Sequence, residues 1–256
     1  MSATPPLILV VDDDVDACHN LADILSDLGY RVRLAHDGPS ALELVRQEAY
    51  DVALLDLKMP GMDGLTLYRE IRKLRAETVA IVVTAYAGSK TEEEVRTAGA
   101  WRLLHKPVDF DRLLPLVSQA VGQPLILVVD DDPDLCASLW DLCRERGFRV
   151  SVAHDEETAA ARLQDRSFNV VLVDMRLPQG DGAGVFRRVR RVNPQARVVL
   201  ITGFRSEMDQ LIQQQVLREG ADAVCEKPFD MPRLLATLER LTGNSPASAD
   251  SESPGP

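Results

Sequence analysis

The sequence is poor in the residues that mark several common classes of protein. Its 256 residues include four cysteines, Cys18, Cys136, Cys143 and Cys225, with no Cys-x-x-Cys pair and no neighbouring His at zinc-ligand spacing. This pattern argues against a zinc module or a disulfide framework, and we expect reduced thiols in or beside the cores. Basic residues are also scarce: 29 Lys and Arg face 40 Asp and Glu, a formal net charge of −11. A dominant phosphate-backbone binding surface is therefore not expected, because such surfaces depend on Lys and Arg.

Long hydrophobic runs are absent as well. No apolar stretch approaches the ~18–20 residues that a membrane helix needs. The segment Met1–Val11 lacks a basic leading region, and its hydrophobic run stops at Asp12–Asp14, so a secretory signal is not expected either. We predict a soluble, cytoplasmic protein.

What the sequence does contain is an internal repeat. The octapeptide LILVVDDD at Leu7–Asp14 returns unchanged at Leu125–Asp132, an offset of 118 (125 − 7). Lys106-Pro107 returns as Lys227-Pro228, an offset of 121 (227 − 106), so three residues are inserted in the second copy, between Thr202 and Gly220. We therefore predict two homologous domains, at residues 5–122 and 123–243.

The remaining segment, residues 244–256, is rich in Ser, Pro, Ala and Gly and has no aliphatic side chain larger than Ala. Such a segment cannot bury enough apolar surface to offset its chain entropy, and we predict a disordered tail. Because the two copies take up the chain as far as Leu241, we expect no output domain.

Within each copy, short apolar runs alternate with stretches of helical spacing. In the first copy we predict strands at residues 7–11, 31–35, 52–55, 79–83 and 103–105, and helices within residues 17–28, 40–47, 65–74, 92–98 and 110–121. Five strand–helix units whose strands are almost continuously Val, Ile and Leu indicate a parallel sheet covered on both faces. The predicted fold class is α/β, with two tandem doubly wound (βα)5 flavodoxin-like domains that each contain a five-stranded parallel sheet.

Polar side chains follow the strands at the points where they end. In the first copy these are Asp12, Asp13, Asp56, Thr84 and Lys106. Because the carboxyl ends of parallel strands meet at one edge of a sheet, three carboxylates, a hydroxyl and an ammonium group should converge there. The second copy supplies the same set: Asp130, Asp131, Asp174, Thr202 and Lys227.

This set of side chains suits the transfer of a phosphoryl group. Three neighbouring carboxylates repel one another, and Mg²⁺, which prefers oxygen ligands, would remove that repulsion. The central carboxylates, Asp56 and Asp174, are competent nucleophiles toward phosphorus and would form an aspartyl phosphate. Mg²⁺, the Lys ammonium and the Thr hydroxyl would then stabilise charge on the phosphoryl oxygens.

The motifs that carry these residues resemble those of response-regulator receiver domains of two-component signalling, and the resemblance extends from residue 7 to about residue 241. The matching segments are VVDDD at 10–14 and 128–132, LLDLKMPGMDG at 54–64, LVDMRLPQGDG at 172–182, VVTAY at 82–86, LITGF at 200–204, HKPV at 105–108 and EKPF at 226–229. Any one motif alone is weak, whereas all of them at the spacing of the family, twice in one chain, form a strong signal.

The resemblance implies a role for each residue. Asp56 and Asp174 are similar to phosphoacceptors that take a phosphoryl group from a histidine kinase or a histidine phosphotransfer protein. Asp13 and Asp131 resemble direct Mg²⁺ ligands, and Asp12 and Asp130 resemble acids that act through metal-bound water. The remaining implied roles are a metal contact from the backbone carbonyls of Lys58 and Arg176, a hydroxyl that turns toward the phosphate from Thr84 and Thr202, and a phosphate-pairing ammonium from Lys106 and Lys227. A phosphorylation-dependent contact with a downstream protein would carry the signal.

The sequence also departs from the family pattern. Many receivers carry Tyr or Phe three residues before the Lys as a switch, whereas this chain has Leu103 and Val224 there. The usual aromatic readout is therefore in question in both copies. The three-residue insertion should lengthen the fourth helix of the second copy, or the loop before it, by about one turn.

Two other interpretations stay open. A haloacid-dehalogenase-type phosphohydrolase would use Asp12 of the Asp12-x-Asp14 pattern as its nucleophile, although the duplication at 118 residues is short for that fold. A passive receiver scaffold or phosphate sink would keep the site without a conformational readout. His36 and His154 recur at the repeat offset without a ligand set around them, and we expect surface turn residues there.

Overall fold

The computed structural model describes residues 5–85, 89–177, 182–203, 214 and 217–243. The chain divides into two compact units, Met1–Gln123 and Pro124–Pro256. The predicted disordered tail lies outside the described residues, and so does most of the segment that contains the insertion. Among the described residues, none of the helices is both long and apolar enough to cross a membrane.

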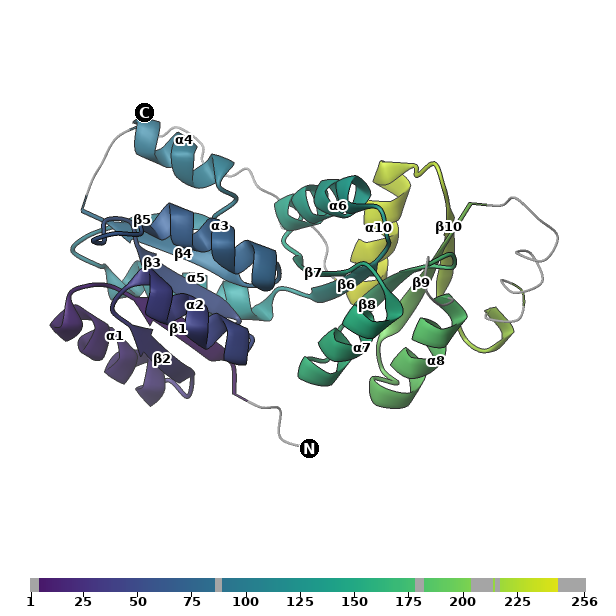
Figure 1. The fold of residues 1–256 in the computed structure, drawn as a ribbon, viewed down its shortest axis with the longest axis horizontal. Coiled ribbons are helices and arrows are strands. Elements are labelled where there is room, and N and C mark those ends of the chain that lie inside the picture. The colour runs from purple at the N-terminus through teal and green to yellow at the C-terminus, as the bar shows by residue number, and fades with distance from the viewer. Residues whose placement is uncertain (1–4, 86–88, 178–181, 204–213, 215–216, 244–256) are drawn as a thin grey trace, which may run out of the picture. The chain divides into compact units, whose positions relative to one another are not determined.

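The first unit alternates five strands and five helices, labelled in Figure 1. The strands are β1 (Leu7–Val11), β2 (Arg31–Ala35), β3 (Val52–Asp56), β4 (Val79–Thr84) and β5 (Arg102–His105). The helices are α1 (Val15–Asp27), α2 (Gly38–Gln47), α3 (Gly64–Leu74), α4 (Ser89–Thr97) and α5 (Phe110–Gly122). Four of these helices begin one to three residues before the predicted start, and in three of them, α1, α2 and α3, an Asp caps the first turn from the residue just before the helix.

The five strands form one parallel sheet in the order β2-β1-β3-β4-β5, which confirms the predicted fold class. Strands β1, β3 and β4 are buried along their whole length, as their continuous apolar sequences predict.

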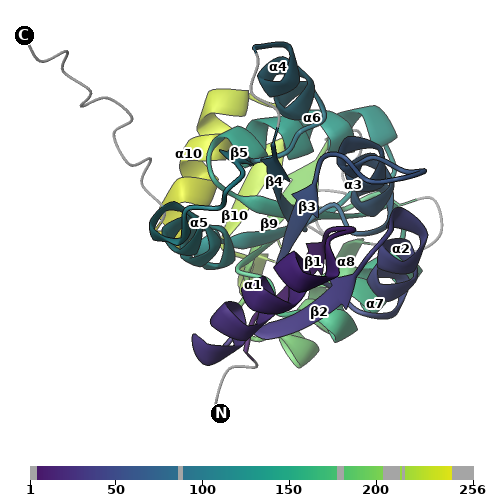
Figure 2. The same ribbon diagram turned by 90° about the vertical axis from the view of Figure 1, so that its left-hand side faces the viewer.

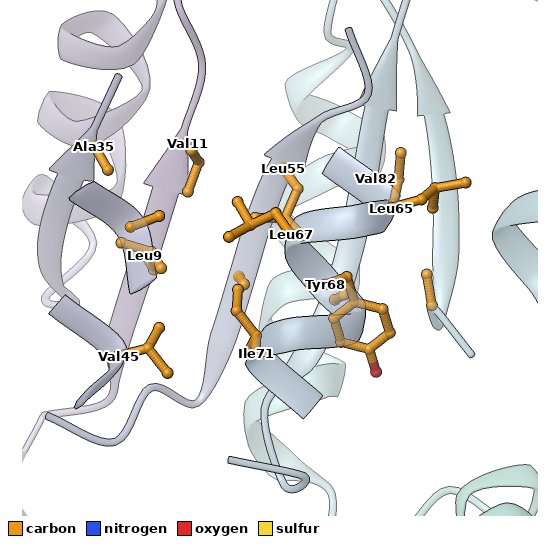
Figure 3. Close-up of a cluster of buried hydrophobic side chains, with 14 of the residues drawn as sticks. Leu9, Val11, Ala35, Val45, Leu55, Leu65, Leu67, Tyr68, Ile71 and Val82 are labelled. Carbon is orange, nitrogen blue, oxygen red and sulfur yellow. The ribbon is translucent and has the colours of Figure 1, made fainter. Parts of the chain in front are cut away.

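Helices cover both faces of this sheet. Figure 2 shows α1 and α5 on one side of it and α2 and α3 on the other. Alternate side chains of a strand point to opposite faces of the sheet, so each face has its own core layer. Ile8 and Val10 of β1 pack in the first layer, with α1 and α5, whereas Leu9 and Val11 pack in the second, with α2, α3 and α4. Figure 3 shows part of the second layer.

Aspartates fix the helix starts beside the functional edge of the sheet. The side chains of Asp14, Asp37, Asp63 and Asp109 accept hydrogen bonds from backbone N–H groups in the first turns of α1, α2, α3 and α5. Each such cap stabilises a helix by about 1 kcal/mol. Part of the acidity of the chain is therefore structural.

The second unit repeats this architecture. Its strands are β6 (Leu125–Val129), β7 (Arg149–Ala153), β8 (Val170–Asp174), β9 (Arg197–Thr202) and β10 (Ala223–Glu226), in a parallel sheet of order β10-β9-β8-β6-β7. Its helices are α6 (Pro133–Glu145), α7 (Glu156–Asp165), α8 (Gly182–Val192) and α10 (Met231–Thr242).

Candidate functional site

The strand ends of the first unit bring together the side chains that the sequence predicts. Asp12 follows β1, Asp56 ends β3, Thr84 ends β4, and Lys106 follows β5. One carboxylate oxygen from each of Asp12, Asp13 and Asp56 lies within 4.8 Å of the others. Asp12, Asp56 and Thr84 are buried, whereas Asp13 is exposed, so the cluster is open to solvent on one side.

Lys106 links two of these carboxylates. Its Nζ lies 2.7 Å from Oδ2 of Asp12 and 3.3 Å from Oδ1 of Asp56. The other oxygen of Asp12 accepts a hydrogen bond from the backbone N–H of Asp14 at 3.0 Å. One ammonium group thus faces three carboxylates, which leaves the cluster with a surplus of negative charge.

Burial and the neighbouring charges shift the pKa values of Asp56 and Lys106. Burial raises the pKa of Asp56, the charge of Lys106 opposes that shift, and the nearby carboxylates of Asp12 and Asp13 add to it. Burial alone would lower the pKa of Lys106, but the hydrogen bond and the charges of Asp12 and Asp56 outweigh it and hold that pKa above its usual value. The pocket therefore disfavours an ionised Asp56 and favours a cation.

Glycine at the start of α3 lets that helix approach the end of β3. A Cβ at Gly64 would collide with the main-chain oxygen of Asp56 and lie 3.2 Å from the Cα of Leu57. The N–H of Gly64 donates to the carbonyl of Leu57 at 3.1 Å, which ties the helix start to the segment after Asp56. The Asp63-Gly64 pair therefore serves both to cap α3 and to fix the position of Asp56.

The second unit builds the same cluster from Asp130, Asp131 and Asp174, whose oxygens also lie within 4.8 Å of one another. Nζ of Lys227 lies 2.7 Å from Oδ2 of Asp130 and 2.6 Å from Oδ2 of Asp174. Here Asp174 also accepts a hydrogen bond from the backbone N–H of Arg176, at 2.8 Å. Thr202 ends β9 and is buried.

The acid whose pKa is raised differs between the two clusters: it is Asp56 in the first and Asp130 in the second. Asp130 is completely buried, and this burial raises its pKa although Lys227 and the N–H of Asp132 act in the opposite direction. Burial would lower the pKa of Lys227, but its contacts with Asp130 and Asp174 more than compensate and raise it. Both clusters therefore combine three acids with one lysine that already pairs with two of them.

The structure also shows neighbours of the site that the sequence reasoning missed. Nδ1 of His36 lies 3.2 Å from the carbonyl oxygen of Asp12, and Sγ of Cys18 lies 3.4 Å from the same oxygen. The second unit repeats this arrangement with His154 at 3.0 Å and Cys136 at 3.4 Å from the carbonyl oxygen of Asp130. The histidines are exposed, as expected of surface residues, but they also contact the acidic loop. The recurrence of His36 and His154 at the repeat offset was the sequence feature that could have pointed to these contacts.

The two positions where the family pattern carries an aromatic residue lie on the last strand of each sheet. Leu103 pairs with Val82, and Val224 pairs with Leu200. Both side chains are partly buried against the core layer on their side of the sheet. Lys58 and Arg176 lie two residues beyond the acids that end β3 and β8, and their metal contacts stay predictions.

Several known proteins are similar to this chain. A response regulator receiver protein of Anaeromyxobacter is 35% identical over 233 residues, which cover 91% of this chain and 94% of that protein. The transcriptional regulatory protein ZraR of Klebsiella oxytoca is 40% identical over 122 residues, 48% of this chain and 28% of that protein. A solved CheY-like receiver domain protein from Methanospirillum hungatei, 32% identical, covers 46% of this chain and 94% of its own length with a TM-score of 0.44. The response regulator receiver domain family matches residues 8–118 and again residues 126–239. The chain belongs to the response regulator receiver domain family and contains two such domains in tandem.

Proposed function

We propose that each receiver domain accepts a phosphoryl group from a phosphohistidine onto an aspartate, Asp56 in the first and Asp174 in the second, and signals through protein contacts. The observation that carries this proposal is the pairing of a three-carboxylate cluster with one lysine at the strand ends, present twice in the chain. Proteins of this family are typically regulators rather than enzymes. The donor would be a histidine kinase or a histidine phosphotransfer protein.

The donor atoms of each cluster fit a magnesium ion. Three carboxylate oxygens within 4.8 Å of one another, one of them from an exposed residue, can bind a hard cation that keeps part of its water. Asp12, Asp13 and Asp56 would hold it in the first domain, with the backbone carbonyl of Lys58. In the second domain the corresponding groups are Asp130, Asp131, Asp174 and the carbonyl of Arg176. Bound Mg²⁺ would neutralise charge on the incoming phosphoryl oxygens.

The side chains of the protein would divide the remaining work. A carboxylate oxygen of Asp56 forms a bond to phosphorus while the phosphorus–nitrogen bond of the phosphohistidine breaks, and the histidine nitrogen takes the electron pair. Lys106 already lies 3.3 Å from this carboxylate and would pair with a phosphoryl oxygen. Thr84, at the end of the neighbouring strand β4, would offer its hydroxyl to another. Thr202 and Lys227 would do the same for Asp174.

Labelling with a small phosphodonor tests the proposal. Incubation with acetyl phosphate and Mg²⁺ should add up to two phosphoryl groups per chain, counted by intact-protein mass spectrometry. Asp56→Ala and Asp174→Ala should each remove one, the double variant should remove both, and excess EDTA should abolish labelling. Asp27→Ala, at an exposed position that ends α1, is the matched control and should label like the unmodified chain. Labelling that survives the double variant would refute the proposal.

Two further measurements separate the alternatives. A haloacid-dehalogenase-type phosphohydrolase would turn over a generic phosphate ester and would depend on Asp12 rather than Asp56. Both oxygens of Asp12 are already engaged, by Lys106 and by the N–H of Asp14, which disfavours that nucleophile. A passive scaffold would label normally but would show the same partner binding and oligomeric state with and without beryllofluoride.

A further inference from the structure

A pocket of 660 Å³ lies next to the acidic cluster of the first domain. Its walls come from β1, α1, the ends of β3 and β4, and the segment that leads into α5. This volume falls within the ~300–1,000 Å³ that is typical of sites for small molecules. The acidic cluster forms only one end of the pocket, and the rest extends along α1.

Most of the wall is apolar. Representative side chains are Val10, Leu21, Ile24, Leu54, Val83 and Val108. Leu21 and Val108 are only partly buried, although they pack against the core on this side of the sheet. Covering these groups would be favourable, at roughly 25 cal/mol for each Å² of apolar surface removed from water.

Most of the charged groups in the wall of the pocket are negative. Four carboxylates line the pocket, from Asp12, Asp14, Asp23 and Asp56, against the single ammonium group of Lys106. Lys106 already pairs with Asp12 and Asp56, whereas Asp14 and Asp23 are exposed and add two negative charges. The pocket therefore favours an apolar occupant that carries a positive charge.

The second domain has bulkier groups at corresponding positions. Leu135 stands in place of Ala17, and Phe229 in place of Val108. Arg146 and Glu239 also form an ion pair at 2.8 Å that joins α6 to α10, where the first domain has Leu28 and Ser118. The repeat thus supplies, within the same fold, side chains that would occupy the space between the first and last helices.

We propose that the pocket between α1 and the start of α5 in the first domain binds an apolar small molecule with one positive charge, such as an aryl-alkyl amine. The apolar part lies against α1 and the sheet, and the ammonium group pairs with Asp14 or Asp23. This inference goes beyond the proposed phosphoacceptor function and does not depend on it, because binding needs neither Mg²⁺ nor a phosphodonor.

Three probes of nearly equal size test the charge preference. The full chain, without Mg²⁺ or phosphodonor, is titrated with 4-phenylbutylamine, with neutral 4-phenylbutanol and with anionic 4-phenylbutyrate. Binding is followed by amide chemical shifts in NMR spectra. The amine should shift residues of α1 and the segment before α5, and it should bind about tenfold or more tightly than the carboxylate. An equal response to all three probes, or shifts confined to other elements, would overturn the proposal.

Filling the pocket with the residues of the second domain tests its location. Ala17→Leu and Val108→Phe should each weaken amine binding by about tenfold or more, because the new side chains occupy the space of the probe. Ala22→Leu makes the same change on α1 at a position outside the wall and should leave binding unchanged. Circular dichroism and thermal melting establish that each variant folds. Because Ala17→Leu and Val108→Phe fill the pocket independently, the test still stands if one of them does not fold. Unweakened binding in both folded variants would overturn the proposal.

Discussion

Replacing the central carboxylate of the first domain should stabilise that domain when no metal is bound. Asp56→Asn keeps the shape of the side chain and removes its charge. The carboxylate lies in a buried position with carboxylate oxygens of Asp12 and Asp13 within 4.8 Å, and it has Lys106 at 3.3 Å. Its raised pKa shows that this environment penalises the ionised form.

The size of the effect follows from opposed contributions. At an effective dielectric constant of about 20, charges 4.8 Å apart repel by about 3.5 kcal/mol, and charges 3.3 Å apart attract by about 5 kcal/mol. The repulsion from Asp12 thus cancels most of the attraction of Lys106, the exposed Asp13 adds a further repulsion that solvent screens, and removing a carboxylate from water costs several kcal/mol. Burial therefore decides the sign. We expect Asp56→Asn to raise the free energy of unfolding by about 1–2 kcal/mol, or roughly 4 °C in Tm for each kcal/mol.

The pH dependence provides a second measurement. Because the pKa of Asp56 is higher in the folded domain than in the unfolded chain, its contribution to stability is fully present below the unfolded pKa of about 3.9 and is lost as the pH rises through the folded pKa. The advantage of Asp56→Asn should therefore be largest near neutral pH and shrink as the solution becomes more acidic. Urea unfolding in EDTA at several pH values measures this difference.

Addition of magnesium should reverse the order. If Mg²⁺ binds the folded unmodified domain as proposed, a concentration 1,000-fold above its dissociation constant adds about 4.1 kcal/mol of stability, which exceeds the advantage of the variant. Asp56→Asn should gain less, because it has lost one ligand carboxylate. Asp130→Asn, at the position of the second domain that corresponds to Asp12, tests the same reasoning on a completely buried acid with a raised pKa. A variant Asp56→Asn that is less stable than the unmodified chain in EDTA at neutral pH would refute the reasoning.

Two further predictions concern the framework of the site. Gly64→Ala should destabilise the first domain by about 2 kcal/mol and reduce labelling of Asp56, because its Cβ would meet the main chain of Asp56 and Leu57, which cannot give way like a side chain. Gly122→Ala, with open space around its Cβ, is the control, and equal melting temperatures for the two variants would contradict the argument. Burial alone would raise the pKa of Asp222, but the N–H of Val198 and the guanidinium groups of Arg197 and Arg190 hold it below its usual value. Its contribution to stability is therefore present above the unfolded pKa and is lost as the pH falls through the folded pKa. Asp222→Asn should cost about 2 kcal/mol at pH 7 by urea unfolding, and a cost that does not decrease in acid would count against this assignment.

The sequence predicted the sheet and the site for the same physical reason. Buried parallel strands need continuous apolar residues, so β1, β3 and β4 were readable, and the acids that follow them had to meet at one edge. The contacts of His36 and Cys18 with the carbonyl of Asp12 were not predictable, because they depend on how β2 and α1 fold back on the loop rather than on any local pattern. Helix starts were also missed by one to three residues, because in α1, α2 and α3 an Asp cap rather than the apolar pattern sets the first helical residue.

The two domains share the cluster of acids and lysine but differ in the residues around it. The three acids and the lysine recur in both domains, and the lysine lies 2.7 Å from the first acid in each, although it is 3.3 Å from Asp56 and 2.6 Å from Asp174. The strand beside the lysine is anchored differently. In the first domain Arg102 stacks on Trp101 at 4.4 Å, whereas in the second Asp222, at the position of Trp101, binds Arg190 and Arg197. Since this edge lies next to the acidic cluster without entering it, it can diverge without loss of the site. The two copies therefore combine the same cluster of three acids and one lysine with two different edges of the sheet.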